Sequence, residues 1–338
     1  MTTATQQAVV DVADPRWFPV DLDPVTPRVA MLRIDEGHVT GPAFMDNRLG
    51  VDFSAAVAVP LQALHALPAP PRAAWLFHTS FCCSTLLARA LQDTPACMVY
   101  REPLVLRRLS DARDRGMAIA PWMVPTTRLL FRPWRDDGVV VVKPTHAALN
   151  IAADLLAATP GSRAVALLSS LDDFLVSNIK KTPETHAKVP ALVERAVAAG
   201  SLRQRLAGRE IEPPSLLAAV ALQWVAQREL LVDIDARAPG RLRFIDASQV
   251  LADLAAAARD CLEWWGLPAD MDALRDRAAA VAAVNAKQTS ATYSARQRED
   301  EAAQLARMFA RELAEARAWF ECEILPAIRP QALALGAG

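Results

Sequence analysis

The segment from Trp75 to Leu91 constrains the fold most, because it joins a short apolar strand, a loop of small polar residues and an amphipathic helix. Where a buried parallel strand ends, the chain must turn back, and the first amides of the next helix have no partner within that helix. Such amides can bind a phosphate or a sulfate group. Ser84 and Thr85 stand where a helix cap is expected, and Pro95 follows soon after the helix. The segment therefore predicts an oxyanion site.

The same residues differ from the P-loop pattern G-x-x-x-x-G-K-[ST] of nucleotide-binding proteins. In that register His78 and Cys83 replace the two glycines, Ser84 replaces the lysine, and only Thr85 matches. A nucleoside triphosphate kinase needs the lysine on the β- and γ-phosphates, so its absence argues against a kinase or an ATPase. An ordinary strand-to-helix turn without a ligand is the alternative interpretation.

Further strands and helices alternate along the chain. The run of valines from Gly138 to Thr145 is continuously hydrophobic, which is typical of a strand buried on both faces of a parallel sheet. Strands that alternate with helices predict an α/β fold with a doubly wound parallel sheet. Other strands are expected over residues 28–35, 97–100, 163–168 and 241–246, and helices over 54–67, 149–158, 169–181, 215–236, 249–265 and from about 294 to 325.

Two charged residues follow predicted strands directly. An open α/β sheet places its chemistry at the carboxyl ends of the strands, so Glu102 is a candidate general base. The alternative is that Glu102 only caps the helix that Pro103 begins. Lys143 ends the valine strand, where we favour a role in the site over a structural ion pair. His146 follows closely and could also reach the cleft.

Composition excludes several classes of protein. With 338 residues, 52% of them hydrophobic, the chain can bury a large core, and a net charge of −1 argues against a broad nucleic-acid surface. A local basic pocket remains compatible with this charge. No apolar stretch approaches the ~20 residues of a membrane span, and residues 1–15 lack the pattern of a secretory signal. The five cysteines lack zinc-binding spacing. We therefore expect a cytoplasmic protein with reduced thiols and no metal, and neither nucleic acid nor a membrane as partner.

The positions of prolines suggest where the chain divides into domains and insertions. Residues 1–70 are expected to form an N-terminal segment packed on the core, and residues 71–338 a P-loop-like α/β domain. Within that domain, residues 182–214 are polar and interrupted by proline, which suits a lid or a substrate-side insertion. The alanine-rich C-terminal helix is compatible with a homodimer.

The order of features from Trp75 to Pro268 resembles the sulfotransferase superfamily, particularly its bacterial and tyrosylprotein-sulfotransferase-like members. In that family the loop is followed by a strand that ends in a glutamate, matched by Glu102, and by a strand that ends in Lys-x-Pro or similar, matched by Lys143. Ser177 matches a helical serine of the family, and Lys287 resembles its C-terminal segment that contacts the donor.

The resemblance implies a three-layer α/β/α sandwich, similar to P-loop NTPases, with helical additions. It implies transfer of a sulfuryl group from 3′-phosphoadenosine 5′-phosphosulfate to a hydroxyl or amine of a small molecule or a peptide side chain, without a metal. Glu102 would be the base and Lys143 the cation that stabilises the leaving group. The residues implied to bind the donor are His78, Thr79, Ser80, Cys82, Cys83, Ser84, Thr85, Ser177 and Lys287.

Phe81 and Ser169 depart from the family pattern, because a typical member has basic residues there. Losing two cations should cost several kcal/mol of donor binding, at ~1.5–3 kcal/mol for each hydrogen bond to a charged group. We expect Ser177 and one of Lys180, Lys181 and Lys287 to bind a 3′-phosphorylated nucleotide weakly, and Ser169→Arg to strengthen this binding. The alternative function is a catalytically degenerate sulfotransferase-fold protein that acts as a nucleotide-, anion- or partner-binding module.

Overall fold

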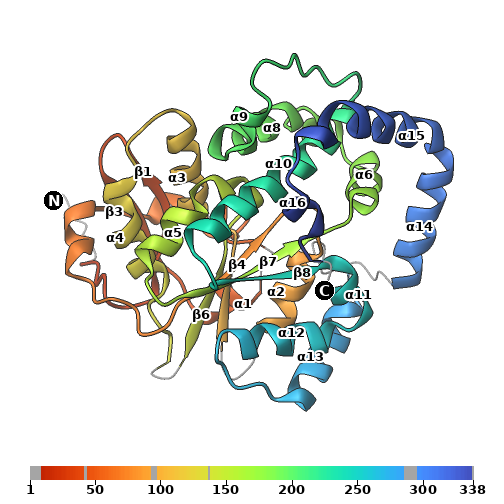
Figure 1. Ribbon diagram of the computed structural model, residues 1–338. Coiled ribbons are helices and arrows are strands. Elements are labelled where there is room, and N and C mark those ends of the chain that lie inside the picture. Colours follow the sequence, from red (N-terminus) through yellow and green to blue (C-terminus); the bar gives the residue numbers. More distant parts are fainter. Residues whose placement is uncertain (1–8, 42–43, 93–96, 136–137, 285–294, 337–338) are drawn as a thin grey trace.

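The computed structural model describes residues 9–41, 44–92, 97–135, 138–284 and 295–336, and its core is a five-stranded parallel sheet (Figure 1). The strand order is β5-β6-β4-β7-β8, with helices on both faces. The predicted α/β fold with a parallel sheet is thus confirmed. The strands are β4 (Ala74–His78), β5 (Cys97–Arg101), β6 (Val139–Lys143), β7 (Arg163–Leu168) and β8 (Leu242–Asp246).

Helices cover the sheet on both sides and extend beyond it. They are α1 (Glu36–Thr40), α2 (Ser84–Leu91), α3 (Leu104–Asp114), α4 (Ala120–Leu130), α5 (Ala152–Ala158), α6 (Leu171–Ile179), α7 (Pro183–His186), α8 (Val189–Ala199), α9 (Leu202–Arg205), α10 (Leu216–Arg237), α11 (Ala247–Ala252), α12 (Leu254–Trp264), α13 (Met271–Ala282), α14 (Ala295–Met308), α15 (Ala310–Trp319) and α16 (Pro330–Ala334).

Side-chain alternation along the strands divides the core into two layers. Trp75 and Phe77 of β4 face one layer, which α3, α4, α5 and part of α10 complete. Ala74 and Leu76 face the other, which α2, α11, α12 and α13 complete. Because successive side chains of a strand point to opposite faces, a continuously apolar strand fits between two layers of helices.

The strand order reverses at β4, and this positions the site. From β4 the chain first builds β5 and β6 on one side and then crosses over to β7 and β8 on the other. In open α/β sheets, ligands bind beyond the carboxyl ends of the strands at such a reversal. The loop from His78 to Thr85 leaves β4 at this point.

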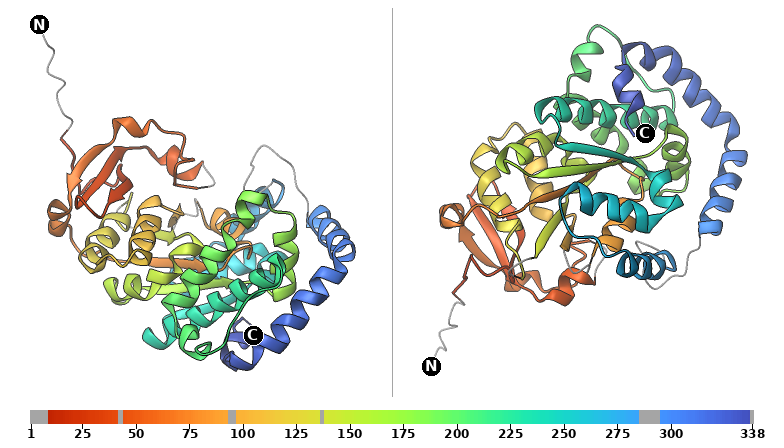
Figure 2. Two further views of the ribbon diagram at one scale, coloured as in Figure 1. Left: turned by 90° about the horizontal axis from the view of Figure 1, so that it is seen from above. Right: turned by 60° about the horizontal axis from the view of Figure 1, so that its bottom comes forward.

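A second, antiparallel sheet precedes the core and packs on α3 and α4. Its strands are β1 (Trp17–Asp23), β2 (Arg28–Arg33) and β3 (Val57–Pro60). Arg132, which is buried, donates hydrogen bonds to the carbonyls of Val12, Asp14 and Trp17 at 2.6–2.7 Å. Figure 2 shows this sheet on the opposite side of the molecule from α14 and α15.

The predicted helix over residues 54–67 is wrong. Two short 3-10 turns, Phe53–Ala55 and Leu61–Ala66, flank β3 there. Pro60 lacks an amide hydrogen and disfavours helical geometry at the residue before it, so it interrupts the apolar pattern. Strand β1 was not predicted.

The C-terminal third differs in detail from the prediction. The helix expected over residues 249–265 is two helices, because Asp253 ends α11 in an extended conformation and caps α12. Helix α13 was not predicted. The long final helix is interrupted at Phe309, and its predicted capping residue, Ser294, lies outside the described residues. Among the described helices, none is both long and apolar enough to cross a lipid bilayer.

The division into domains stays a prediction. Helix α8 of the predicted lid or insertion packs on α10, which is buried along most of its length. No residue of 182–214 lines the cavity described below.

Candidate functional site

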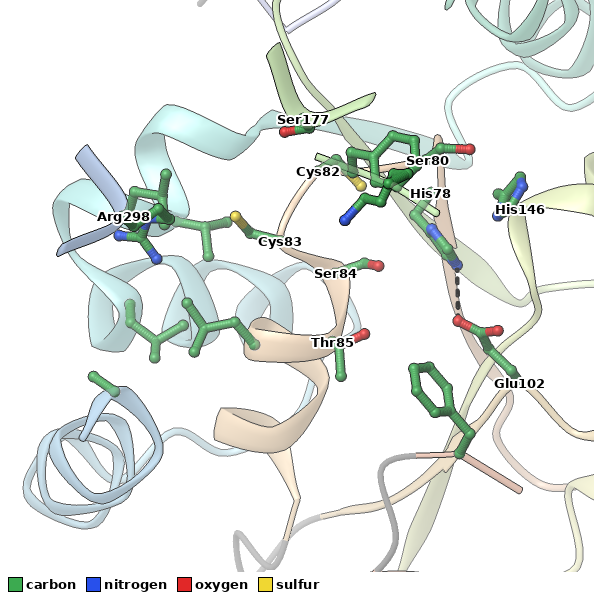
Figure 3. Close-up of a pocket in the computed structure, with 18 of the residues that line it drawn as sticks. His78, Ser80, Cys82, Cys83, Ser84, Thr85, Glu102, His146, Ser177 and Arg298 are labelled. Atoms are coloured by element: carbon green, nitrogen blue, oxygen red, sulfur yellow. Dashed lines mark ion pairs between the residues drawn. The ribbon is translucent and has the colours of Figure 1, made fainter. Parts of the chain in front are cut away.

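A cavity of about 490 Å³ lies beyond the carboxyl end of β4 (Figure 3). The loop after β4 forms one wall, together with Glu102 after β5 and His146 after β6. Its other walls come from the C-terminal end of α6, from α11 to α14, and from Phe44 and Arg48 of the N-terminal segment. The volume lies within the ~300–1,000 Å³ usual for small-molecule sites.

The loop has an unusual backbone. Phe81 and Cys83 have φ angles of 57° and 61°, a left-handed conformation that normally favours glycine. Left-handed residues within a turn allow successive amides to point into one concavity, as in phosphate-binding nests. Cys83 is the residue before α2, so the loop passes directly into the first amides of the helix. The loop therefore contains two left-handed residues of the kind found in such nests, although neither is glycine.

Ser84 and Thr85 do not cap α2, contrary to the expectation. They are the first two residues of the helix, which has no side-chain cap. Their hydroxyl groups point into the cavity (Figure 3), where a bound anion could accept hydrogen bonds from them and from the adjacent amides.

Contacts with β7 and α10 hold the back of the loop. The Thr79 amide donates to the Leu167 carbonyl at 2.9 Å, and the Ser80 amide donates to Oε1 of Gln227 at 3.2 Å. Cys82 donates its thiol hydrogen to the Thr79 carbonyl, and burial raises the pKa of this thiol to about 12. Ser80 and Cys82 line the cavity, whereas Thr79 does not. Cys82 is therefore a neutral thiol and not a nucleophile at pH 7.

Glu102 and Lys143 form a buried ion pair. The ammonium of Lys143, which is fully buried, donates to Oε1 of Glu102 at 2.7 Å, and the Glu102 amide donates to the Lys143 carbonyl at 2.6 Å. The backbone of Glu102 is left-handed, with φ at 59°. Burial alone would raise the pKa of Glu102, but the charge of the Lys143 ammonium and its hydrogen bond lower it to about 2.

This arrangement decides between the interpretations that the sequence left open. Glu102 does not cap α3, because the helix begins after Pro103 without a side-chain cap. Glu102 lines the cavity, while Lys143 lies behind it in the ion pair that was the alternative for this residue. The carboxylate of Glu102 is therefore accessible to a ligand. The Lys143 ammonium affects the cavity by lowering the pKa of that carboxylate.

His78 and His146 lie beside the carboxylate. The Nε2 atom of His78 is 2.9 Å from the Pro144 carbonyl oxygen and 3.9 Å from Oε1 of Glu102 (Figure 3), and its ring centroid is 6.0 Å from that of His146. Burial, together with the charge of Lys143, lowers the pKa of His78 well below its usual value. His78 packs under Glu102 and borders the cavity.

The opposite wall is basic. Ser177, Lys180 and Lys181 line it at the end of α6, and Arg298 reaches it from α14. The Nζ atom of Lys181 is 4.8 Å from the ring centroid of Phe81, so a cation lies over an aromatic ring of the loop. Within the described part of the chain, Arg298 forms no ion pair.

The cavity lining contains more basic than acidic side chains. Of the described residues that line it, Glu102 is the only acidic one, whereas Arg48, Lys180, Lys181 and Arg298 are basic. Two of these basic residues are already paired with carboxylates outside the lining, Arg48 with Asp46 and Lys180 with Glu301. Arg298, Arg48 and the apolar wall of Val250, Leu251 and Leu254 were not predicted, because no local pattern marks residues that only the fold brings to the loop.

One residue of the sequence prediction, Ser169, lies away from the cavity, and another, Lys287, lies outside the described residues. Ser169 is 1% exposed and does not line the cavity, and its carbonyl accepts a hydrogen bond from the indole of Trp224. An arginine at this position would bury its guanidinium beside that of Arg228, so the expectation for Ser169→Arg loses its basis. Among the described residues, no group of three or more His, Cys, Asp and Glu side chains is placed to hold a metal ion.

Comparisons with known proteins give distant structural similarity only. No family model and no curated protein matches this chain. A sulfotransferase from Alicyclobacillus acidocaldarius is 17% identical, with 72% of this chain and 98% of that chain covered and a TM-score of 0.38. A sulfotransferase domain from the curacin biosynthetic pathway is 10% identical, with coverages of 79% and 97% and a TM-score of 0.39. Retinol dehydratase, in complex with androsterone and the inactive cofactor PAP, is 12% identical, with coverages of 80% and 87% and a TM-score of 0.38.

We predict that Cys83→Gly stabilises the protein relative to Cys83→Ala. Both changes remove the thiol, but only glycine relieves the left-handed backbone, which costs roughly 1–2 kcal/mol for other residues. Urea unfolding should therefore give a free energy of unfolding about 1 kcal/mol higher for the glycine variant. Equal stabilities would contradict a left-handed residue at this position.

The ion pair also predicts a pH dependence of stability. Because the folded-state pKa of Glu102, about 2, lies below its ordinary value of 4.5, the carboxylate stabilises the fold above pH 4.5 and loses this effect as the pH falls. Between pH 6 and pH 3 the parent should lose about 2 kcal/mol more than Glu102→Gln, which has no titrating group there. Urea unfolding of both proteins at the two pH values measures this, and a difference that does not change with pH would refute it.

Proposed function

We propose that this protein transfers a sulfuryl group from 3′-phosphoadenosine 5′-phosphosulfate to a hydroxyl or amine of a small molecule or a peptide side chain. The observation that carries the proposal is the distribution of groups in one cavity. A left-handed loop and a helix N-terminus lie beside a basic wall, and a buried, ionised carboxylate lies at the other end. Transfer of an anionic group needs oxyanion donors, cations and a proton acceptor in this proximity.

The donor would be held by residues from three parts of the chain. The first amides of α2, with the hydroxyls of Ser84 and Thr85, suit its phosphosulfate group. Ser177, Lys181 and Arg298 supply a hydroxyl and two cations for a further phosphate. The apolar residues of α11 and α12 suit the face of a base.

Glu102 would take the acceptor's proton. The acceptor oxygen or nitrogen forms a bond to sulfur, the bond between sulfur and the phosphate oxygen breaks, and the proton passes to the carboxylate. The phosphate then leaves with the bonding electron pair, and the amides and cations of the loop side stabilise its charge. At a pKa of about 2 the carboxylate is ionised at neutral pH but weakly basic, so it accepts the proton only as the acceptor atom becomes acidic during bond formation.

One observation favours the alternative of a binding module without transfer. Lys143 already neutralises Glu102, and the weak basicity that results is unfavourable for general base catalysis. A protein of this kind would bind the same nucleotide and release it unchanged.

Binding of the product nucleotide tests both forms of the proposal. We predict that adenosine 3′,5′-bisphosphate binds more tightly than adenosine 5′-monophosphate in calorimetric titration, because the basic wall can bind the second phosphate. Arg298→Gln should reduce this preference by roughly tenfold, since a hydrogen bond to a charged group is worth ~1.5–3 kcal/mol. Arg307→Gln removes the same charge from the same helix outside the cavity and serves as the control. Equal affinities for both nucleotides, unaffected by Arg298→Gln, would refute the donor site.

Turnover separates the enzyme from the binding module. If the chain transfers sulfuryl groups, Glu102→Gln should lower turnover by ~10²–10⁴, because a general base is lost, while affinity for the bisphosphate changes little. The exposed control Glu315→Gln should behave as the parent does. Unchanged turnover in Glu102→Gln would exclude this carboxylate from the mechanism, and nucleotide binding without turnover in the parent would identify a binding module.

A further inference from the structure

A second cavity, of about 730 Å³, lies beyond the amino ends of β4 and β7, at the opposite end of the strands from the first cavity. Its walls are the segment that leads into β4, the turn between α5 and β7, part of α4 and the residues after α12. The five residues of β4 separate it from the first cavity, a length of about 16 Å at ~3.3 Å per residue. The two cavities therefore lie at opposite ends of the same strand.

Three arginines line this second cavity, Arg72, Arg128 and Arg163, and none of the described residues that line it is acidic. Across the described chain, many other arginines are paired with carboxylates, as Arg108 is with Asp21. In the same described residues, none of the three forms such a pair. Because the whole chain carries a net charge of −1, three guanidinium groups without a counter-charge are a local concentration of positive charge.

Backbone contacts hold two of these arginines in place. Arg128 donates from Nη1 to the Leu67 carbonyl at 2.8 Å and to the His65 carbonyl at 3.3 Å. Arg163 donates from Nη1 to the Trp264 carbonyl at 3.0 Å, and its guanidinium carbon is 4.9 Å from the Trp264 ring centroid. These carbonyls orient the guanidinium groups but do not neutralise them. Each group has five N–H donors, most of which remain available to a ligand.

We propose that this cavity is a second anion-binding site, which takes a small ligand bearing a phosphate group. Phosphate oxygens match the planar fork of a guanidinium and neutralise its charge, so a lining that contains three arginines and no carboxylate favours this chemistry over a neutral ligand. Inorganic phosphate and a phosphate ester share it. The rings of Pro70, Pro71 and Trp265 form apolar walls against which the organic part of an ester would pack.

Titration calorimetry with ribose 5-phosphate and with inorganic phosphate tests the proposal on the full-length protein. The parent should bind ribose 5-phosphate at two sites, one at each end of β4. Arg72→Gln should weaken one binding event by about tenfold or more, and Arg72→Lys less, because lysine keeps the charge but loses the fork. Arg72→Gln,Arg163→Gln should abolish that event. Tighter binding of the ester than of inorganic phosphate identifies an organic ligand, and equal binding identifies the inorganic ion.

Matched variants keep this test independent of the proposed transferase activity. Arg298→Gln should weaken the other binding event and leave this one unchanged. Arg311→Gln, which removes an exposed arginine on α15, should affect neither. A parent that binds at one site only, with an affinity that the double variant leaves unchanged, would overturn the second anion site whether or not the first cavity binds a nucleotide.

Discussion

The buried ion pair between Lys143 and Glu102 is the interaction on which the rest of the site depends. A fully buried ammonium needs a counter-charge, and removing one partner of such a pair typically costs ~3–5 kcal/mol. The pair joins the carboxyl ends of the neighbouring strands β5 and β6, where an amide-to-carbonyl hydrogen bond accompanies it. It thereby fixes the carboxylate of Glu102 at the cavity and keeps it ionised. The ring of His78 packs beside this carboxylate.

The loop after β4 lies at the same carboxyl ends of the strands, but the cations near it come from distant parts of the chain. A usual P-loop contains its own lysine, whereas here Lys181 of the segment after α6 lies over Phe81, and Arg298 reaches the cavity from α14. Backbone amides and hydroxyls come from the loop, and cations come from the opposite wall. A ligand in this cavity would therefore contact both the loop after β4 and the C-terminal helices.

The sequence predicts the sheet well, because continuous β-branched runs such as that of β6 leave little choice except a buried parallel strand. It predicts less well where one proline changes the structure, as Pro60 does in β3. The sequence predicts Glu102 and the loop at one end of the sheet from their places after strands, and both line the cavity there. Lys143 was placed correctly in the chain, but whether its ammonium reaches the cavity depends on tertiary packing. Arg298 lies more than 200 residues from the loop, so no local spacing could have linked the two.

The left-handed backbone at Phe81, Cys83 and Glu102 has a consequence for how such proteins are found and engineered. A strained residue of this kind costs roughly 1–3 kcal/mol, so a library selected for thermal tolerance alone would enrich glycine at Cys83. At Glu102 the same change would leave the buried Lys143 ammonium unpaired, which typically costs more, ~3–5 kcal/mol. At Cys83 glycine would restore the familiar loop consensus, and at Glu102 it would delete the carboxylate. Sequence searches for a glycine-rich loop use glycine as a marker of left-handed backbone. They miss chains in which other residues adopt the left-handed conformation because tertiary contacts impose it.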